Sequence, residues 1–173
     1  ICRGKGLSMV LHLNSHREGF AEGFTPITRL DETEDDTGIA FGVLRLRGGE
    51  VYEETAEHET AWLLMDGKTT IHLGGRAIAL ERRSLFDESA SCIHVAAGEA
   101  VRITADADSE FTVYATANAK RFEPAVYLPD DVPNEHRGAG QVGGACLRFV
   151  RTIFDDTISD KNADLVLGEV VTM

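Results

Sequence analysis

The stretch Thr60-Ala-Trp-Leu-Leu-Met-Asp-Gly-Lys-Thr-Thr-Ile-His-Leu-Gly-Gly75 decides the fold class. Residues 60–65 form a short apolar run, and residues 69–73 form a second one. The pair Asp66-Gly67 between them favours a type I′ turn, because both central residues of that turn need positive φ. The stretch therefore predicts two short strands joined by a tight hairpin, with Gly74-Gly75 as the next turn.

Similar short apolar runs lie on both sides of this stretch. They cover residues 39–46, 77–80, 92–95, 100–104 and 111–115. Strands that recur about every 8–12 residues, with turn residues between them, are typical of a sandwich or a barrel. The sequence therefore predicts an all-β fold.

The composition shifts after residue 117. Prolines and a cluster of glycines between about 118 and 143 indicate a connecting segment, and strand character resumes at residues 145–150 and 165–171. The chain begins at Ile1 and ends directly after the last apolar run. We therefore expect it to be a piece of a longer protein.

The charge and the cysteine content limit which binding partners and which cellular compartment are expected. The chain has 17 Lys and Arg against 29 Asp and Glu, a net charge of −12, which argues against nucleic acid and against an anionic membrane surface. Its three cysteines are widely spaced and odd in number, so we expect no disulfide framework, with Cys92 and Cys146 as small core residues. Residues 7–13 are too short an apolar run for a signal peptide, and we expect a cytoplasmic location.

Two glycine motifs match phosphate-binding patterns, but their contexts do not. Gly138-Ala-Gly-Gln-Val-Gly143 matches GxGxxG, yet a polar segment precedes it and a strand-like segment follows it, where a dinucleotide fold needs a strand and then a helix. Gly67-Lys68-Thr69 resembles the end of a P-loop, but Trp62 stands where the first glycine belongs. We interpret both as turns.

Two clusters of metal-ligating residue types have equally simple interpretations. His12 and His16 have the spacing of a helical zinc pair, but Leu13 replaces the glutamate that would activate water. The acidic run 31–36 lacks the glycine of a calcium loop. We expect ordinary histidines and a solvated loop.

A third cluster is chemically richer. Glu57-His58-Glu59 precedes the strand that contains Trp62, and His72 and His94 lie on later strands. Three imidazoles suffice for a catalytic metal. Strand histidines more commonly form hydrogen bonds at a barrel mouth, and the sequence leaves open whether His58, His72 and His94 converge.

Several segments in order resemble one family. They include Arg45-Leu-Arg-Gly-Gly-Glu-Val-Tyr-Glu-Glu54 and Ala61-Trp-Leu-Leu-Met-Asp-Gly-Lys68, followed by residues 83–87, 93–103, 135–140, 147–155 and 165–171. From about residue 39 onward the chain resembles the 5-deoxy-glucuronate isomerase family of inositol catabolism, whose sister is 5-keto-4-deoxyuronate isomerase. The resemblance implies an all-β cupin barrel, a jelly-roll or double-stranded β-helix, plus the start of a second cupin.

The resemblance also implies an organisation into parts. Residues 1–117 would be an amino-terminal cupin, residues 118–162 a linker with one strand, and residues 163–173 the opening strand of a second, truncated cupin. Family members use a divalent transition metal, Zn or Mn, held by three His and one Glu in the second cupin after a strand like 165–171. None of these ligands falls on a residue of this chain, so we expect the metal in the missing second cupin.

The first cupin can be compared with the metal-binding cupin pattern. An alignment on Gly49 and Gly67 places the two His positions of the pattern at Thr55 and Glu57. The Glu position of the pattern falls on Thr60 or, with a shift of one residue, on Glu59. The third His position falls on Val101. One carboxylate does not hold a transition metal. We therefore assign no catalytic, substrate-binding or metal residue here and expect a metal-free cupin.

Three functional hypotheses follow. The first is an intact metal-dependent aldose–ketose isomerase that converts 5-deoxy-glucuronate to 2-deoxy-5-keto-gluconate, with this fragment alone inactive. The second is a non-catalytic cupin module that binds a small sugar acid or serves dimerisation; the sequence allows a homo-oligomer but does not fix the oligomeric state. The third is a metal site formed by His58, His72 and His94.

Overall fold

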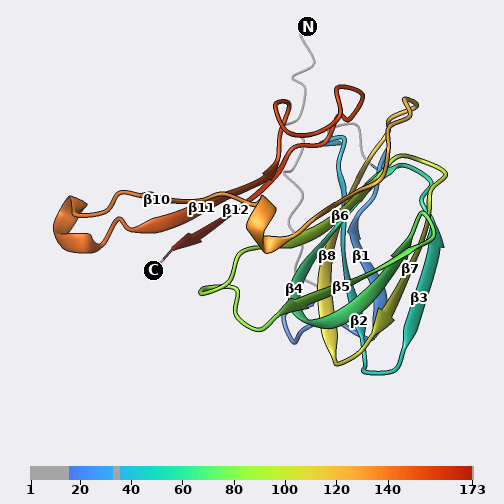
Figure 1. Ribbon diagram of the computed structural model, residues 1–173, viewed down its shortest axis with the longest axis horizontal. Coiled ribbons are helices and arrows are strands. Elements are labelled where there is room, and N and C mark those ends of the chain that lie inside the picture. The colour runs from blue at the N-terminus through green and yellow to red at the C-terminus, as the bar shows by residue number, and fades with distance from the viewer. Residues whose placement is uncertain (1–15, 33–35, 173) are drawn as a thin grey trace, which may run out of the picture.

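The computed structural model of the protein describes residues 16–32 and 36–172, which form an all-β structure (Figure 1). Its strands are β1 (Gly23–Thr28), β2 (Ala40–Leu46), β3 (Val51–Thr55), β4 (Glu59–Leu73), β5 (Arg76–Arg82), β6 (Ser91–Val95), β7 (Ala100–Ala105), β8 (Ser109–Thr116), β9 (Ala125–Tyr127), β10 (Asn134–Arg137), β11 (Arg148–Phe154) and β12 (Leu167–Thr172). Two short 3₁₀ helices, η1 (Pro129–Asp131) and η2 (Gln141–Gly144), lie between the later strands. The all-β class predicted from the sequence is confirmed.

Strand β4 connects the two halves of the barrel. Its first half pairs with β8 and β6, in the strand order β1-β2-β8-β4-β6-β9, and its second half pairs with β7 and β5, while β3 pairs with β7. Every described strand pair is antiparallel. The long strand therefore passes from one sheet into the other.

The predicted hairpin at Asp66-Gly67 is wrong, because β4 continues through both residues. The pairing of β4 with β8 shifts register between Leu64 and Asp66, and Gly67 has φ +113°. A Cβ at Gly67 would overlap Ser109 Oγ, whose hydroxyl accepts a hydrogen bond from the Lys68 N–H. The glycine thus bends the strand rather than reversing it. The chain reverses instead at Gly74-Gly75, as predicted, where φ is 56° and 76°.

The barrel interior is filled by one side of its strands. On β4 the inward residues are Trp62 and Leu64 in the first half and Ile71 and Leu73 in the second. They pack with inward residues of the other strands, which include Leu44, Ile93, Val101, Ile103 and Phe111. This alternation of buried side chains, with a period of two residues, is what the sequence pattern of a barrel predicts.

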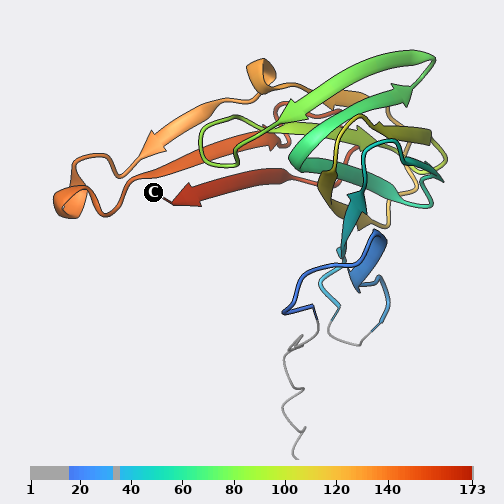
Figure 2. The same ribbon diagram turned by 90° about the horizontal axis from the view of Figure 1, so that it is seen from below.

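The opposite side of the β4 and β6 strands supports a second cluster. Ala61, Leu63 and Cys92 pack against residues from beyond the barrel, among them Ile153, Phe154, Leu165 and Leu167. Strands β10, β11 and β12 form a separate sheet that extends away from the barrel in both views (Figures 1 and 2).

The region after residue 117 contains more strands than the sequence analysis expects. Between residues 118 and 162 the structure forms β9, β10 and β11, where one strand is predicted. Strand β9 joins the barrel by pairing with β6, and β11 pairs with β12. The division at residues 117 and 162 stays a prediction, but the segments on either side of residue 117 pack together.

Candidate functional site

The structure places His58, His72 and His94 apart. His72 lies on the exposed face of β4, paired in register with Arg102, whereas His94 is buried on β6 opposite Ala61. His58 lies in the loop between β3 and β4. Among residues 16–32 and 36–172, no group of three or more His, Cys, Asp or Glu side chains is placed to hold a metal ion.

The positions that correspond to cupin metal ligands also do not fit a metal. Val101 is buried in the apolar core, and Thr55 is an exposed residue at the end of β3. Glu57 lies at the barrel mouth, and Glu59 is fully engaged in hydrogen bonds described below. The described part of this barrel therefore does not provide the ligand set that a transition metal requires.

Glu59 is the centre of a buried hydrogen-bond cluster. Its carboxylate is 0% exposed and accepts hydrogen bonds from His94 Nε2 at 2.8 Å and Asn118 Nδ2 at 2.7 Å. It also accepts the backbone N–H groups of Asp164 at 2.8 Å and Leu165 at 2.9 Å. Burial alone would raise the pKa of Glu59, but these hydrogen bonds outweigh it and lower the pKa to about 2. Glu59 thus fixes the segment before β12 to the barrel.

Aromatic rings complete the environment of His94. Its ring stacks on Phe154, with centroids 4.2 Å apart and an interplanar angle of 5°, and lies 4.8 Å from Phe122. The imidazole therefore joins a carboxylate on one strand to an aromatic residue from β11. The sequence left open whether His94 is a metal ligand or a strand histidine held by hydrogen bonds, and the structure shows the second. Nothing in the local pattern points to Glu59 as its partner.

Two buried arginines make a second connection between the barrel and the carboxy-terminal sheet. Arg82 from β5 and Arg151 from β11 each contact Glu169 Oε1 at 2.6 Å, and both are about 1% exposed. Arg151 also donates to the carbonyl oxygens of Leu85 at 2.8 Å and Phe86 at 3.0 Å. Because these charges are buried, the loss of one partner would leave an unpaired charge out of water and would strongly destabilise the fold. The cluster fixes β11 and β12 against the segment after β5.

A cavity of about 460 Å³ opens at the barrel end where β4 begins. Its walls come from the inward faces of β1, β2 and β8, namely Phe24, Pro26, Ala40, Gly42, Val113 and Ala115. Arg29, Glu57 and His58 lie at its rim. A volume of this size is in the usual range for a small-molecule site.

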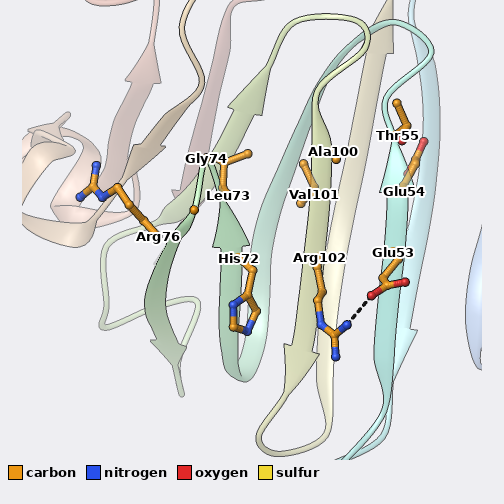
Figure 3. Close-up of a pocket in the computed structure, with 11 residues that line it drawn as sticks. Glu53, Glu54, Thr55, His72, Leu73, Gly74, Arg76, Ala100, Val101 and Arg102 are labelled. Atoms are coloured by element: carbon orange, nitrogen blue, oxygen red, sulfur yellow. Dashed lines mark hydrogen bonds and ion pairs between the residues drawn. The ribbon is translucent and has the colours of Figure 1, made fainter.

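A shallower groove of about 610 Å³ crosses the outer face of the barrel (Figure 3). Glu53 on β3, Arg102 on β7 and His72 on β4 lie side by side across it, and Arg102 forms an ion pair with Glu53. Arg76, at the start of β5, lies at the far side. The acid and base in its centre already neutralise each other, so the groove offers little net charge for a ligand.

Of the two glycine motifs, one has the structural role predicted for it, and the turn predicted at Gly67-Lys68-Thr69 is wrong. Residues 138–143 lie in the loop that joins β10 to β11, and Gly67-Lys68-Thr69 lies inside β4 rather than in a turn. Neither precedes an α-helix in the described chain. The interpretation of Gly138–Gly143 as a connecting turn is confirmed.

The remaining candidates are structural. Cys92 is fully buried, as predicted, and burial raises the pKa of its thiol, while Cys146 is only partly buried. His16 stacks on Phe20 with centroids 5.3 Å apart, whereas His12 and Cys2 lie outside the described residues.

In the acidic run 31–36, which is only partly described, the Asp36 carboxylate accepts the backbone N–H of Asp31 at 2.6 Å and that of Gly38 at 2.9 Å. It therefore orders a turn. No helix in the described chain is long and apolar enough to cross a membrane.

An antiparallel barrel built around one bent strand defines the class as an all-β cupin, as predicted. The chain belongs to the KduI/IolB family, whose model matches residues 12–173, and this is a family of sugar isomerases. A comparison with curated proteins finds no match.

Two solved structures resemble the chain over most of its length. An IolB-like protein from Salmonella typhimurium LT2 is 21% identical, with a TM-score of 0.61, covering 70% of this chain and 46% of that one. A putative glyoxylate induced protein from Pseudomonas aeruginosa is 15% identical, with a TM-score of 0.60, covering 85% and 54%. These similarities show the fold, and the chain spans about half the length of either structure.

Proposed function

We propose that this chain is the amino-terminal part of a metal-dependent aldose–ketose isomerase that converts 5-deoxy-glucuronate to 2-deoxy-5-keto-gluconate in inositol catabolism. The observation that carries the proposal is the family match over residues 12–173. The order of the cupin segments along the sequence supports the proposal through its resemblance to the 5-deoxy-glucuronate isomerase family. The enzyme would act in the cytoplasm as a homo-oligomer.

The metal, Zn or Mn, and its ligands would lie in a second cupin outside these 173 residues. In this barrel the ligand positions are occupied by residues such as Thr55 and Val101, which do not fit a metal. The role of this barrel is then to support its neighbour. Glu59 and the Arg82–Glu169–Arg151 cluster hold β12 in a fixed position, and β12 is the strand that would lead into the second cupin.

A second candidate function is a non-catalytic cupin module that binds a small sugar acid or serves dimerisation. The cavity at the barrel mouth favours it, because an apolar wall with ionisable groups at its rim is the usual composition of a small-molecule site. The two functions are compatible in one protein.

The proposed activity is tested by incubating the metal-loaded full-length protein with 5-deoxy-glucuronate and following the sugar acid by NMR. We expect the aldehyde signal to be replaced by that of the keto isomer. Absence of conversion by a folded, metal-loaded protein would overturn the proposal.

The place of the metal is tested by metal analysis of full-length variants. We expect His58→Ala and His72→Ala to retain the metal content of the unmodified protein, because neither side chain belongs to a ligand cluster in the described chain. A loss of metal in either variant would favour a site in this barrel.

A further inference from the structure

The cavity at the barrel mouth exists because inward side chains become small towards that end. The cross-strand pairs of β2 and β8 run from the mouth inward as Ala40 with Ala115, Gly42 with Val113, and Leu44 with Phe111. The last pair is fully buried in the core, whereas the two alanines are only partly covered. Strands β2 and β8 are continuous along this stretch (Figure 1), so their small residues open the space on this side, while β1 has a register shift between Pro26 and Thr28.

Phe24 provides the apolar wall of the cavity. Its ring lies over Gly42, where an added Cβ would be 2.5 Å from Phe24 Cε2. The side chain is nevertheless 45% exposed, so part of its surface faces the opening. A large exposed apolar side chain beside a cavity offers a surface against which the less polar side of a ligand can pack.

The rim carries three ionisable side chains with no partner in the described chain. For Arg29, Glu57 and His58, no side-chain hydrogen bond or ion pair is formed within residues 16–32 and 36–172. Two exposed arginines elsewhere on this barrel are paired with acids, Arg102 with Glu53 and Arg45 with Glu110, whereas Arg76 on β5 forms no side-chain hydrogen bond or ion pair within the described residues. As far as residues 16–32 and 36–172 show, the rim groups are therefore available to a ligand.

The charge of the rim limits the ligand class. One arginine and one glutamate suit a ligand with a single negative charge and several hydroxyl groups, because guanidinium binds a carboxylate in bidentate fashion while carboxylate and imidazole bind hydroxyls. A phosphate dianion would meet too few cations. In a chain of net charge −12, an anion also needs a local cation in order to approach at all.

We propose that the barrel mouth is a binding site for a small polyhydroxy monocarboxylate, a sugar acid, with Arg29 holding its carboxylate. Glu57 and His58 bind its hydroxyl groups, and Phe24 packs against its ring. This site is separate from the proposed catalytic cupin. The inference rests on the proposed function only for the sugar acid chosen as the probe, D-glucuronate.

The test is calorimetric titration of the full chain with D-glucuronate, with D-glucose as the uncharged probe. We expect D-glucuronate to bind the barrel at least tenfold more tightly than D-glucose does. Arg29→Gln should weaken the binding of D-glucuronate at least tenfold, and Ala115→Leu, which fills the cavity, should remove one binding site per chain. The matched control is Arg76→Gln, in the groove of Figure 3, which should leave the binding unchanged.

Three results would overturn the inference. They are no binding of D-glucuronate, equal affinity in Arg29→Gln and the unmodified protein, and a loss in Arg76→Gln equal to that in Arg29→Gln. Thermal unfolding of each variant verifies that it is folded. Because the titration needs no turnover, a failed isomerase assay with intact glucuronate binding would overturn the proposed function alone.

Discussion

Replacing Glu59 by glutamine should detach the carboxy-terminal segment from the barrel. The carboxylate of Glu59 is 0% exposed and accepts hydrogen bonds from two side chains and two backbone N–H groups. These contacts lower its pKa from 4.5 to about 2. A difference of this size corresponds to about 3 kcal/mol of folding free energy at neutral pH.

The pH dependence follows from the direction of this shift. Since the folded-state pKa is below that of the unfolded chain, the contribution of Glu59 is complete above about pH 4.5 and is lost as the pH falls towards 2. The stability difference between the unmodified protein and Glu59→Gln should therefore shrink by about 1.4 kcal/mol for each pH unit in that window. Above pH 5 it should be constant.

Urea unfolding of the full chain between pH 7 and pH 3 measures this difference. Hydrogen exchange should in addition become faster at the amides of Asp164 and Leu165, which lose their acceptor. The control is Glu53→Gln, an exposed acid on β3, which should change stability by no more than about 0.5 kcal/mol. A Glu59→Gln difference below about 1 kcal/mol at pH 7, or one that does not vary with pH, would refute the reasoning.

Three further predictions concern other parts of the fold. Gly67→Ala should destabilise the protein by about 2–4 kcal/mol in urea unfolding, because the added Cβ has no space. The control Gly49→Ala, with open space around the residue, should cost about 1–2 kcal/mol. Equal losses in the two variants would contradict the bend in β4. Arg151→Met should cost about 3–5 kcal/mol, because it leaves a buried glutamate with one partner fewer; a loss below 1 kcal/mol would show that the charge cluster is dispensable. Iodoacetamide should modify Cys146 in the native protein but Cys92 only in denaturant, by peptide mass spectrometry; native labelling of Cys92 would contradict its burial.

The barrel strands were predictable because their signal is local. Alternating apolar residues and Gly74-Gly75 suffice for the strands around them. The bend at Gly67 was not predictable, because an Asp-Gly pair favours a hairpin locally, and only pairing with β8 and β6 on one side and β7 and β5 on the other shows that the strand continues. Strand β3 was missed because Val-Tyr-Glu-Glu-Thr is too polar to stand out.

The candidate sites depend on residues that are distant in the chain. Glu59 bonds to backbone groups more than 100 residues away, and no spacing rule connects them. His94 was considered as a metal ligand, and its stacking on Phe154 has no signal in the sequence. A weak signal existed for the barrel mouth, since Ala40, Gly42 and Ala115 are small residues in strands whose other inward positions are large.

The Glu59 cluster also bears on how the protein is made. The last barrel strand, β9, is complete at Tyr127, but the backbone groups that satisfy Glu59 belong to Asp164 and Leu165. At a synthesis rate of about 5–20 residues per second, several seconds pass before these residues are made. Until then the Glu59 carboxylate and the apolar outer face of β4 and β6 stay exposed to water. During this interval the nascent chain is vulnerable to aggregation and is a natural client for a chaperone. Docking of residues 164–165 ends that interval.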